Sequence, residues 1–316
     1  MVGIVILNYN TFADVVECVN SIRQATHINY KIYIVDNLST DDSYYNLLNK
    51  FNKSSDVSLI SSNKNGGYSY GNNLGIKMAI KDGCEFILIS NPDIVYYDYS
   101  IDRMLEYLKK HDEVGIVGPS CASLDSEESQ LFRKIYDNKL YIFSRKPLRS
   151  FAKLFKSLRT EYDKPDKNDF VFDGMVRGCC FLISSELFEK IGFFDDNIFL
   201  YAEEWILAKK ISNLFFKCAC TFDSRVLHKE ATSTNKKGSA FKTYHLYLSE
   251  FYYMKIYNKS SYPILFLYYI SNLFLFFFRA VFKRDYRKMF KAFYVSSKRL
   301  MFSSRDISDA SNKIEG

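Results

Sequence analysis

The sequence has no paired-cysteine motif, and its first residues do not have the features of a signal peptide. Its seven cysteines include no CxxC pair: Cys179 and Cys180 are adjacent, and Cys218 and Cys220 are separated by one residue. Adjacent strand residues such as Cys179 and Cys180 face opposite ways, and neither pair has the CxxC spacing, so no shared zinc site is predicted and we expect reduced core thiols in a cytosolic protein. The N-terminus has neither the charged start nor the cleavage site of a signal peptide, so residues 2–7 are interpreted as a strand.

Two glycine-rich nucleotide-binding motifs are also missing. After the first predicted strand the chain reads LNYNT at residues 7–11, which is neither GxGxxG nor GxxxxGK[ST]. Dinucleotide binding is therefore disfavoured and a P-loop is excluded. Tyr9 has the ring to stack on a base. The alternative is an ordinary strand-to-helix turn with Asn10 or Thr11 as the N-cap.

Composition favours a folded enzyme-sized chain over a disordered one. The 316 residues are 47% hydrophobic and 17% aromatic, enough for one large domain or two modest ones with a full core. The net charge is +7 and the pI is about 8.8. A mild basic excess suggests anionic partners without choosing among nucleic acid, nucleotide and membrane surface.

Short apolar runs alternate with helical periodicity over the first ~120 residues. Strands are expected at residues 2–7, 31–35, 57–60, 86–89 and 114–117, and helices at 12–22, 39–48 (capped by Ser39), 70–80 and 101–108. Repeated βα units predict an α/β fold with a mostly parallel sheet covered on both faces. Residues 120–168 are interpreted as an irregular insert. Strands at 170–172, 181–184 and 217–222 and helices at 186–191 and 203–213 follow.

Polar residues stand at or just after the carboxyl ends of these strands, where ligands bind in such sheets. They are Asn8, Asp36, Asn65 and Asp93. The Asp36 carboxylate has the chemistry to accept a hydrogen bond from a pyrimidine imide. The sequence Asn65-Gly66-Gly67 lets the backbone approach a ligand closely, although a plain turn is the alternative. Asn72 places an amide near the next helix start.

The sequence Asn91-Pro92-Asp93 ends a buried strand in a rigid turn. Proline fixes the turn, and Asp93 then projects from the strand end. Carboxylate and phosphate oxygens are ligands for hard divalent cations, so this turn predicts a Mg²⁺ or Mn²⁺ site at a diphosphate. The alternative is a solvated loop acid.

A second acidic cluster, Glu203-Glu204, precedes an amphipathic helix. Adjacent carboxylates repel, which raises the pKa of at least one of them and suits a general base. The alternative is a pair of acids that complement a helix dipole. His228 ends a later strand. A lone histidine is usually structural, and only its neighbours make it a candidate metal ligand.

The C-terminal part has a different character. Residues 262–282 are almost continuously apolar or aromatic. From Arg279 to Arg299 the sequence contains eight Lys or Arg residues and one acidic residue, Asp285. Such a segment suits a helix lying on an anionic membrane. It is also barely long enough to span a bilayer. A third interpretation is a helix pair packed on the domain or on a partner.

The motifs together resemble the family 2 glycosyltransferases of GT-A fold, especially the rhamnosyltransferase-like branch of bacterial surface-polysaccharide pathways. The resemblance covers about residues 1–235. It is carried by VILNYN, IVDNLSTDDS, NKNGGYSYGNNLGI, ILISNPDI, VGIVGP, VRGCCFLISSELFEKIGFFDDNIFLYAEEW and VLHKEATS.

The resemblance implies roles for individual positions. Tyr9 and Asp36 look like base-contacting residues, and Asn91-Pro92-Asp93 looks like a DxD-type element with Asp93 as the metal ligand. His228 matches a further metal ligand. Glu204 matches the general base, with Glu203 as its rival. The implied nucleotide-sugar site comprises Asn8, Tyr9, Asn10, Asp36, Asn65, Gly66, Gly67, Asn72, Asn91 and Asp93.

Three positions depart from the family pattern. Asn91 replaces the first aspartate of DxD, which weakens that metal site. The acidic pair is Glu-Glu instead of Glu-Asp, so the catalytic acid is one methylene longer. Asn72 stands where many relatives carry an arginine, so one phosphate contact is missing.

The resemblance implies an inverting glycosyltransferase that moves a sugar, with dTDP-rhamnose favoured, to a polyprenol-linked glycan at the cytoplasmic membrane face. The expected cofactor is Mg²⁺ or Mn²⁺, and no nucleic-acid partner is expected. The alternatives are a UDP-hexose transferase, a non-catalytic nucleotide-sugar-binding module and a nucleotidyltransferase. The expected division is a nucleotide-sugar half (1–120), an acceptor and catalytic half (121–235) and a basic helical tail (236–316).

Overall fold

The computed structural model describes residues 1–124, 133–135, 169–229 and 238–302. A nine-stranded sheet forms the centre of the molecule. The described strands are β1 (Val2–Asn8), β2 (Tyr30–Asp36), β3 (Val57–Ser61), β4 (Phe86–Ser90), β5 (Ile94–Tyr96), β6 (Val114–Ser123), β7 (Arg133–Lys134), β8 (Phe170–Phe172), β9 (Gly174–Met175), β10 (Cys180–Ser184) and β11 (Lys217–His228). All of them belong to this sheet except β7 and β9, which pair with each other in a separate two-stranded sheet. The helices are α1 (Phe12–Ala25), α2 (Ser43–Phe51), α3 (Gly67–Lys81), α4 (Ser100–Lys110), α7 (Ser185–Lys190), α8 (Glu203–Ser212), α10 (Gly238–Tyr252), the π-helical η2 (Tyr253–Tyr257), α11 (Tyr262–Phe282) and α12 (Arg284–Phe302).

The main sheet has the order β3-β2-β1-β4-β10-β6-β11-β5, and β8 pairs with β11. Strands β1 to β4 are mutually parallel, and β6 is parallel to β11. The inserted strand β10 runs antiparallel to β4 and β6, and β5 and β8 run antiparallel to β11. An antiparallel strand brings its first residues, not its last, to the edge where the parallel strands end. Residues just before β10 therefore reach the site edge.

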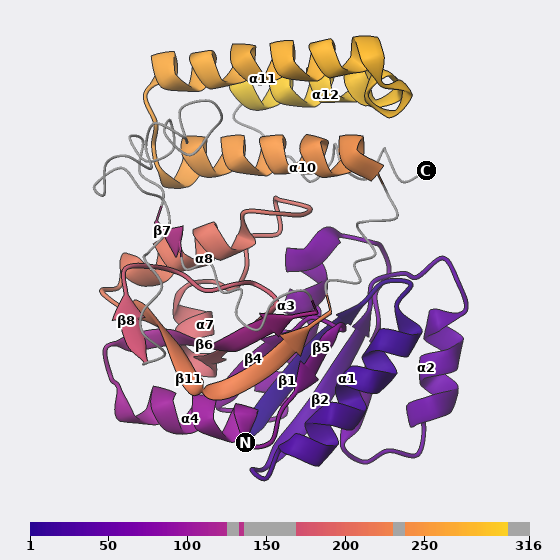
Figure 1. The fold of residues 1–316 in the computed structure, drawn as a ribbon, viewed down its shortest axis with the longest axis vertical. Helices are drawn as coiled ribbons and strands as arrows, with labels where there is room; N and C mark the ends of the chain where they lie inside the picture. Colours follow the sequence, from indigo (N-terminus) through magenta and orange to yellow (C-terminus); the bar gives the residue numbers. More distant parts are fainter. Residues whose placement is uncertain (125–132, 136–168, 230–237, 303–316) are drawn as a thin grey trace.

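Helices cover both faces of the sheet, as Figure 1 shows. Helices α1, α2 and α4 contribute to the hydrophobic core on one face, and α3, α7 and α8 contribute to the core on the other. Strand β1 supplies residues to both cores, with Ile4 and Ile6 facing one way and Val5 the other. This two-sided burial explains the unbroken apolar runs in the sequence.

Two predicted boundaries are wrong for local reasons. The helix expected from residue 39 begins at Ser43. Ser39 does not cap it, because the Ser39 hydroxyl donates to Asp36 Oδ1 at 2.6 Å. The strand expected to end at residue 222 continues to His228 through a shift of register between Thr221 and Arg225. Most of the insert expected at 120–168 lies outside the described residues.

The C-terminal helices form a third layer. Figure 1 shows α10 between the sheet-containing body and the pair α11–α12. These helices share a hydrophobic core with Ala202, Trp205 and Ile206 at the start of α8. The tail is therefore packed against the segment that carries the acidic pair.

Helix α11 has two unlike faces. One face is buried against its neighbours and includes Tyr269, Asn272 and Phe276. The opposite face exposes large apolar side chains: Leu267, Ile270, Phe274, Phe277, Phe278, Val281 and Phe282. Among the residues that the structure describes, α11 is the one helix long and apolar enough to cross a membrane, by length and composition only.

Candidate active site

A cavity of about 360 Å³ opens where the parallel strands end. Segments that are distant in the sequence line it: the turn after β1, the start of α3, the turn after β4, the residues before β10, the segment 199–204, the end of β11 and α10. Its lining includes Tyr9, Asn37, Asn65, Gly67, Tyr68, Asn91, Asp93, Arg177, Cys179, Tyr201, Glu203, Glu204 and His228. The predicted metal-binding and catalytic side chains thus border one space.

The Asn91-Pro92-Asp93 turn is held from two sides. The Asn91 amide donates to the Cys179 carbonyl at 2.7 Å, and the Ser90 hydroxyl donates to the Asn91 carbonyl at 3.0 Å. Tyr96 donates in turn to the Ser90 hydroxyl at 2.8 Å. These bonds leave the backbone of the turn little freedom, so the direction of the Asp93 side chain is set by buried structure.

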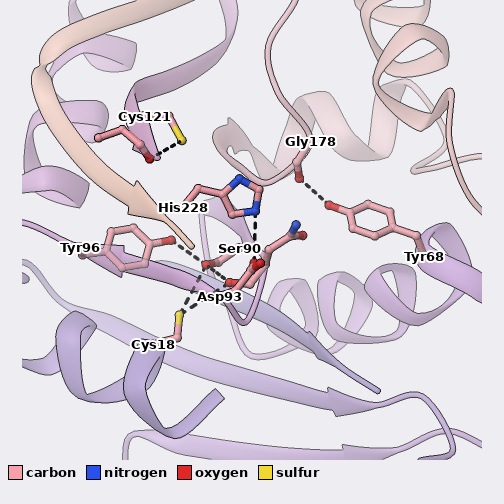
Figure 2. A network of polar contacts seen from close by, with 10 residues as sticks. Cys18, Tyr68, Ser90, Asp93, Tyr96, Cys121, Gly178 and His228 are labelled. Atoms are coloured by element: carbon pink, nitrogen blue, oxygen red, sulfur yellow. Dashed lines mark hydrogen bonds and ion pairs between the residues drawn. The ribbon is translucent and has the colours of Figure 1, made fainter. Parts of the chain in front are cut away.

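His228 meets Asp93 because β11 pairs with β5, which places His228 opposite Ile94. The imidazole Nε2 lies 3.3 Å from Asp93 Oδ1, and Figure 2 shows the ring pointing at the carboxylate. Asp93 is 4% exposed. Burial lowers the pKa of His228, but the Asp93 carboxylate outweighs this and raises the pKa above its ordinary value.

The Asp93–His228 pair has the properties of a cation site. Among the described residues, Asp93 Oδ2 and His228 Nδ1 have no hydrogen-bond partner, and Nε2 lacks a well-aligned one. Buried polar atoms without partners are costly, and a bound ion removes that cost. A carboxylate oxygen and an imidazole nitrogen both suit Mn²⁺, and the carboxylate suits Mg²⁺. The residues present therefore fit the predicted divalent metal.

The acidic pair is aimed by a strained turn. Tyr201 and Ala202, which directly precede Glu203, have φ values of 71° and 67°. Non-glycine residues in the left-handed region cost of order 1 kcal/mol each and persist where the surroundings impose them. Helix α10 supplies part of that support, because the Ser249 hydroxyl donates to the Leu200 carbonyl at 2.8 Å.

The two glutamates occupy different environments. Glu203 is buried, its Oε2 has no hydrogen-bond partner among the described residues, and burial followed by the Glu204 charge raises its pKa well above the ordinary value. Glu204 is half-buried and lies so close to Gly178 that a Cβ there would be 2.8 Å from Glu204 Oε1. Burial, then the charges of Glu203 and Glu204, raise the pKa of Tyr68, which also lines the cavity. Of the two glutamates, Glu203 is therefore the one whose protonated form is favoured by its burial.

Five of the predicted nucleotide-sugar residues do not line the cavity: Asn8, Asn10, Asp36, Gly66 and Asn72. Asp36 is 2% exposed, and its carboxylate accepts hydrogen bonds from Asn8 Nδ2, the Ser39 amide and the Ser39 hydroxyl. Asn10 bonds to Thr40 across the same loop. These residues shape the loop beside the cavity, and their predicted contact with a nucleotide stays a prediction.

Gly67 is required by the fold itself. Its φ is +84°, and a Cβ there would lie 2.1 Å from the Phe199 carbonyl oxygen. The neighbouring Tyr68 amide donates to that carbonyl at 2.9 Å. The glycine turn therefore approaches the backbone of the 199–204 segment closely, and the contact with a ligand expected at this turn stays a prediction.

The sequence motifs missed several lining residues, of which Arg177 and Tyr68 are the most informative. Arg177 adds a cation to the lining of the cavity, whereas the arginine that many relatives carry at the position of Asn72 is absent. Tyr68 donates to the Gly178 carbonyl at 2.6 Å and so fixes the loop between them. The signal for Arg177 was its place in the VRGCC stretch, directly before an apolar strand.

Comparison with known proteins places the chain among glycosyltransferases. It is 26% identical over 204 residues to the low-salt glycan biosynthesis hexosyltransferase Agl10 of Haloferax volcanii, covering 64% of this chain and 58% of that protein. It is 24% identical over 231 residues to the N-acetylglucosaminyl-diphospho-decaprenol L-rhamnosyltransferase of Mycobacterium tuberculosis, covering 68% of this chain and 72% of the relative.

Solved structures show the same fold. GalNAc-T7 with UDP, GalNAc and Mn²⁺ superposes with a TM-score of 0.56 at 15% identity, over 74% of this chain and 44% of that one. Residues 1–349 of TarS from S. aureus, in complex with UDP, give 0.51 at 12% identity, over 84% and 69%. The predicted α/β fold of GT-A type is confirmed. Because the glycosyl transferase family 2 model matches residues 3–192, more than half of the sequence, the chain belongs to that family, as its motifs predict.

Proposed function

We propose that the protein is an inverting glycosyltransferase that moves one sugar from a nucleoside-diphosphate donor to a lipid-linked glycan acceptor. The observation that carries this proposal is the convergence of Asp93, His228 and Glu204 on one cavity. Direct displacement needs a cation site for the diphosphate and a carboxylate beside the acceptor hydroxyl, and this cavity is lined by candidates for both.

Glu204 is the proposed general base. It accepts the proton of the acceptor hydroxyl while the hydroxyl oxygen forms a bond to the anomeric carbon from the face opposite the diphosphate. The bond from that carbon to the diphosphate oxygen breaks, and its electron pair leaves with the nucleoside diphosphate. Glu203 is disfavoured as the base because burial raises its pKa and so favours the protonated form, which cannot accept a proton.

The donor side of the cavity is assigned to cationic and metal-binding groups. Asp93 and His228 would hold Mg²⁺ or Mn²⁺, and Arg177 offers a further cation to the phosphates. A bound divalent ion would neutralise the charge that develops on the departing diphosphate. Tyr9 and Asn37, both of which line the cavity, supply a ring and an amide for the nucleoside.

The favoured donor is dTDP-rhamnose and the favoured acceptor is a polyprenol-linked oligosaccharide of a surface polysaccharide. The named rhamnosyltransferase relative and the sequence motifs of that branch support this choice. A UDP-hexose donor is the second candidate, supported by the hexosyltransferase relative and by the UDP in both structural neighbours.

A panel of nucleotide sugars tests the donor. With Mn²⁺ present, a donor that binds the folded state raises the melting temperature, by an amount that grows with its concentration over its Kd. We expect dTDP-rhamnose to give the largest shift, with UDP-hexoses and free nucleotides as comparison arms. A shift with none of the nucleoside-diphosphate sugars would contradict the proposed function.

The protein is proposed to bind the cytoplasmic face of the membrane through α11 and α12. The exposed apolar face of α11 is contiguous along the helix, and α12 exposes basic side chains such as Arg287, Lys288 and Lys291. Apolar side chains beside basic ones suit an interface with anionic lipid. A polyprenol-linked acceptor would be located at the same membrane surface.

Vesicle flotation tests this attachment. The full chain should float with vesicles that contain anionic lipid, and less so with neutral vesicles or at high salt, because the basic contribution is screened. The double variant Phe274→Asp/Phe278→Asp should stay in the aqueous fraction. Phe215→Asp is the matched control, because Phe215 is 93% exposed and lies in the turn between α8 and β11. Wild-type protein that never floats would remove the membrane from the proposal.

A further inference from the structure

Two cysteines converge on His228, the histidine of the Asp93–His228 pair. Cys121 lies on β6, Cys179 directly precedes β10, and His228 ends β11. One ligand atom from each residue lies within 4.8 Å of the other two. Cys121 is 1% exposed and Cys179 is 7% exposed. The cluster is therefore enclosed, yet its histidine borders the cavity.

Strand register explains why Cys121 meets His228. In the parallel pair β6–β11, Cys121 is the partner of Val226, and His228 follows two residues later. Residues two apart on a strand share a face, so His228 is a diagonal neighbour of Cys121 on the same side of the sheet. Cys179 comes from the opposite edge of β6, because β6 lies between β11 and β10 in the sheet, and Cys179 directly precedes β10.

The His228 imidazole lies between the Asp93 carboxylate and the cysteine thiols. Its Nε2 faces Asp93 at 3.3 Å, while Nδ1 has no hydrogen-bond partner among the described residues. Figure 2 shows Asp93 and Cys121 on opposite sides of the His228 ring. A buried ring nitrogen without a partner, next to two thiols, is the observation that points to a ligand.

We propose that Cys121, Cys179 and His228 form a second cation site, selective for a thiophilic divalent ion such as Zn²⁺. Two sulfur ligands and one nitrogen ligand are a zinc donor set, and thiolate ligands disfavour Mg²⁺ and Mn²⁺. Two thiolates about 2.3 Å from a tetrahedral zinc lie roughly 3.8 Å apart, so the cluster needs to contract by about 1 Å at most.

Binding at this site releases protons and leaves a position open. Each thiol that becomes a ligand loses its proton to solvent, so two protons leave when one Zn²⁺ is bound. Three protein ligands leave the fourth tetrahedral position for water or a substrate oxygen. The site is thus built to hold a metal without closing it off from the cavity.

The two cation sites share one histidine. If the proposed function holds, a Zn²⁺ ion on His228 Nδ1 leaves the proton of the neutral imidazole on Nε2, and that nitrogen then cannot ligate a second cation beside Asp93. Zinc then inhibits sugar transfer, and added Mn²⁺ relieves the inhibition only in part, because thiolates bind Zn²⁺ more strongly. Binding itself does not depend on the proposed function.

Cobalt substitution tests the binding of a thiophilic ion in the wild-type protein. One equivalent of Co²⁺ should produce an intense thiolate-to-cobalt charge-transfer absorption, which equimolar Zn²⁺ abolishes. Cys121→Ser and Cys179→Ser should each weaken or remove this absorption. Cys84→Ser is the control, because Cys84 is also a buried cysteine but contacts the Tyr33 hydroxyl and is not part of this cluster. This variant should leave the absorption unchanged.

Two results would overturn the site. Wild-type protein that binds Co²⁺ without any charge-transfer absorption does not use its thiols, and this result needs no variant to fold. An absorption that survives in both Cys121→Ser and Cys179→Ser, or that is lost in Cys84→Ser, would assign the thiolates to another place. Absence of transfer activity with a retained absorption would instead reject the proposed function and keep the zinc site.

Discussion

Glu204→Gln should lower kcat by about 10²- to 10⁴-fold, the contribution expected from a positioned general base. Glutamine keeps the size of the side chain and its contact with Gly178, but it cannot accept the acceptor proton. The donor does not depend on that proton transfer, so its binding should survive. Steady-state kinetics with a polyprenol-linked acceptor, together with the donor-induced shift of melting temperature, measure the two effects separately.

Glu203→Gln is the matched control for that substitution. It changes the same chemical group one residue earlier, yet we expect transfer to remain within an order of magnitude of wild type. Near-normal rates in Glu204→Gln, with the loss appearing in Glu203→Gln instead, would reverse the assignment of the base. Equal losses in both variants would point to a shared structural role at the start of α8.

The control variant also carries a stability signature. Because burial raises the pKa of Glu203, the folded protein binds more protons than the unfolded chain between the ordinary value of 4.5 and the folded value. Wild-type stability therefore falls as the pH rises through that window. Glutamine cannot ionise, so Glu203→Gln should flatten this fall and raise the melting temperature at neutral pH.

The βα half of the molecule was predictable because its signals are local. The apolar runs that end at Asp36 and Asp93 are buried strands with helices on both sides, and such runs have few other structural solutions. Parallel strands end at one edge, so polar residues after them were expected to gather there. Asn65, Asn91 and Asp93 do line the cavity. The Asp36 carboxylate instead accepts hydrogen bonds from Asn8 and Ser39 in the adjacent loop.

The remaining features of the site depend on strand pairings and backbone conformations that no local sequence pattern indicates. Insertion of β10 between β4 and β6 brings Arg177 and Cys179 to the site from the start of an antiparallel strand. The left-handed residues Tyr201 and Ala202 have no glycine to mark them in the sequence. Spacing among the cysteines likewise predicted no shared site, because Cys121 meets Cys179 only through the sheet.

Asp93→Asn should lower kcat/KM by about 10²- to 10³-fold, which corresponds to roughly 3–4 kcal/mol of lost electrostatic stabilisation. Asparagine preserves the shape of the buried side chain but removes the charge that attracts a divalent ion and the diphosphate it would hold. Affinity for Mn²⁺, measured by titration calorimetry in the presence of the donor, should fall together with the activity.

Asp98→Asn provides the control, because Asp98 lies just after β5, the strand that Asp93 directly precedes, but its side chain is 65% exposed and pairs with His27. Exposed pairs contribute little, so this variant should keep both activity and Mn²⁺ affinity. If EDTA-treated wild-type protein transferred sugar at the full rate, Asp93 and His228 would lose the metal role altogether. Their unpartnered atoms would then have to be satisfied by the donor itself, with Arg177 as the main cation for its phosphates.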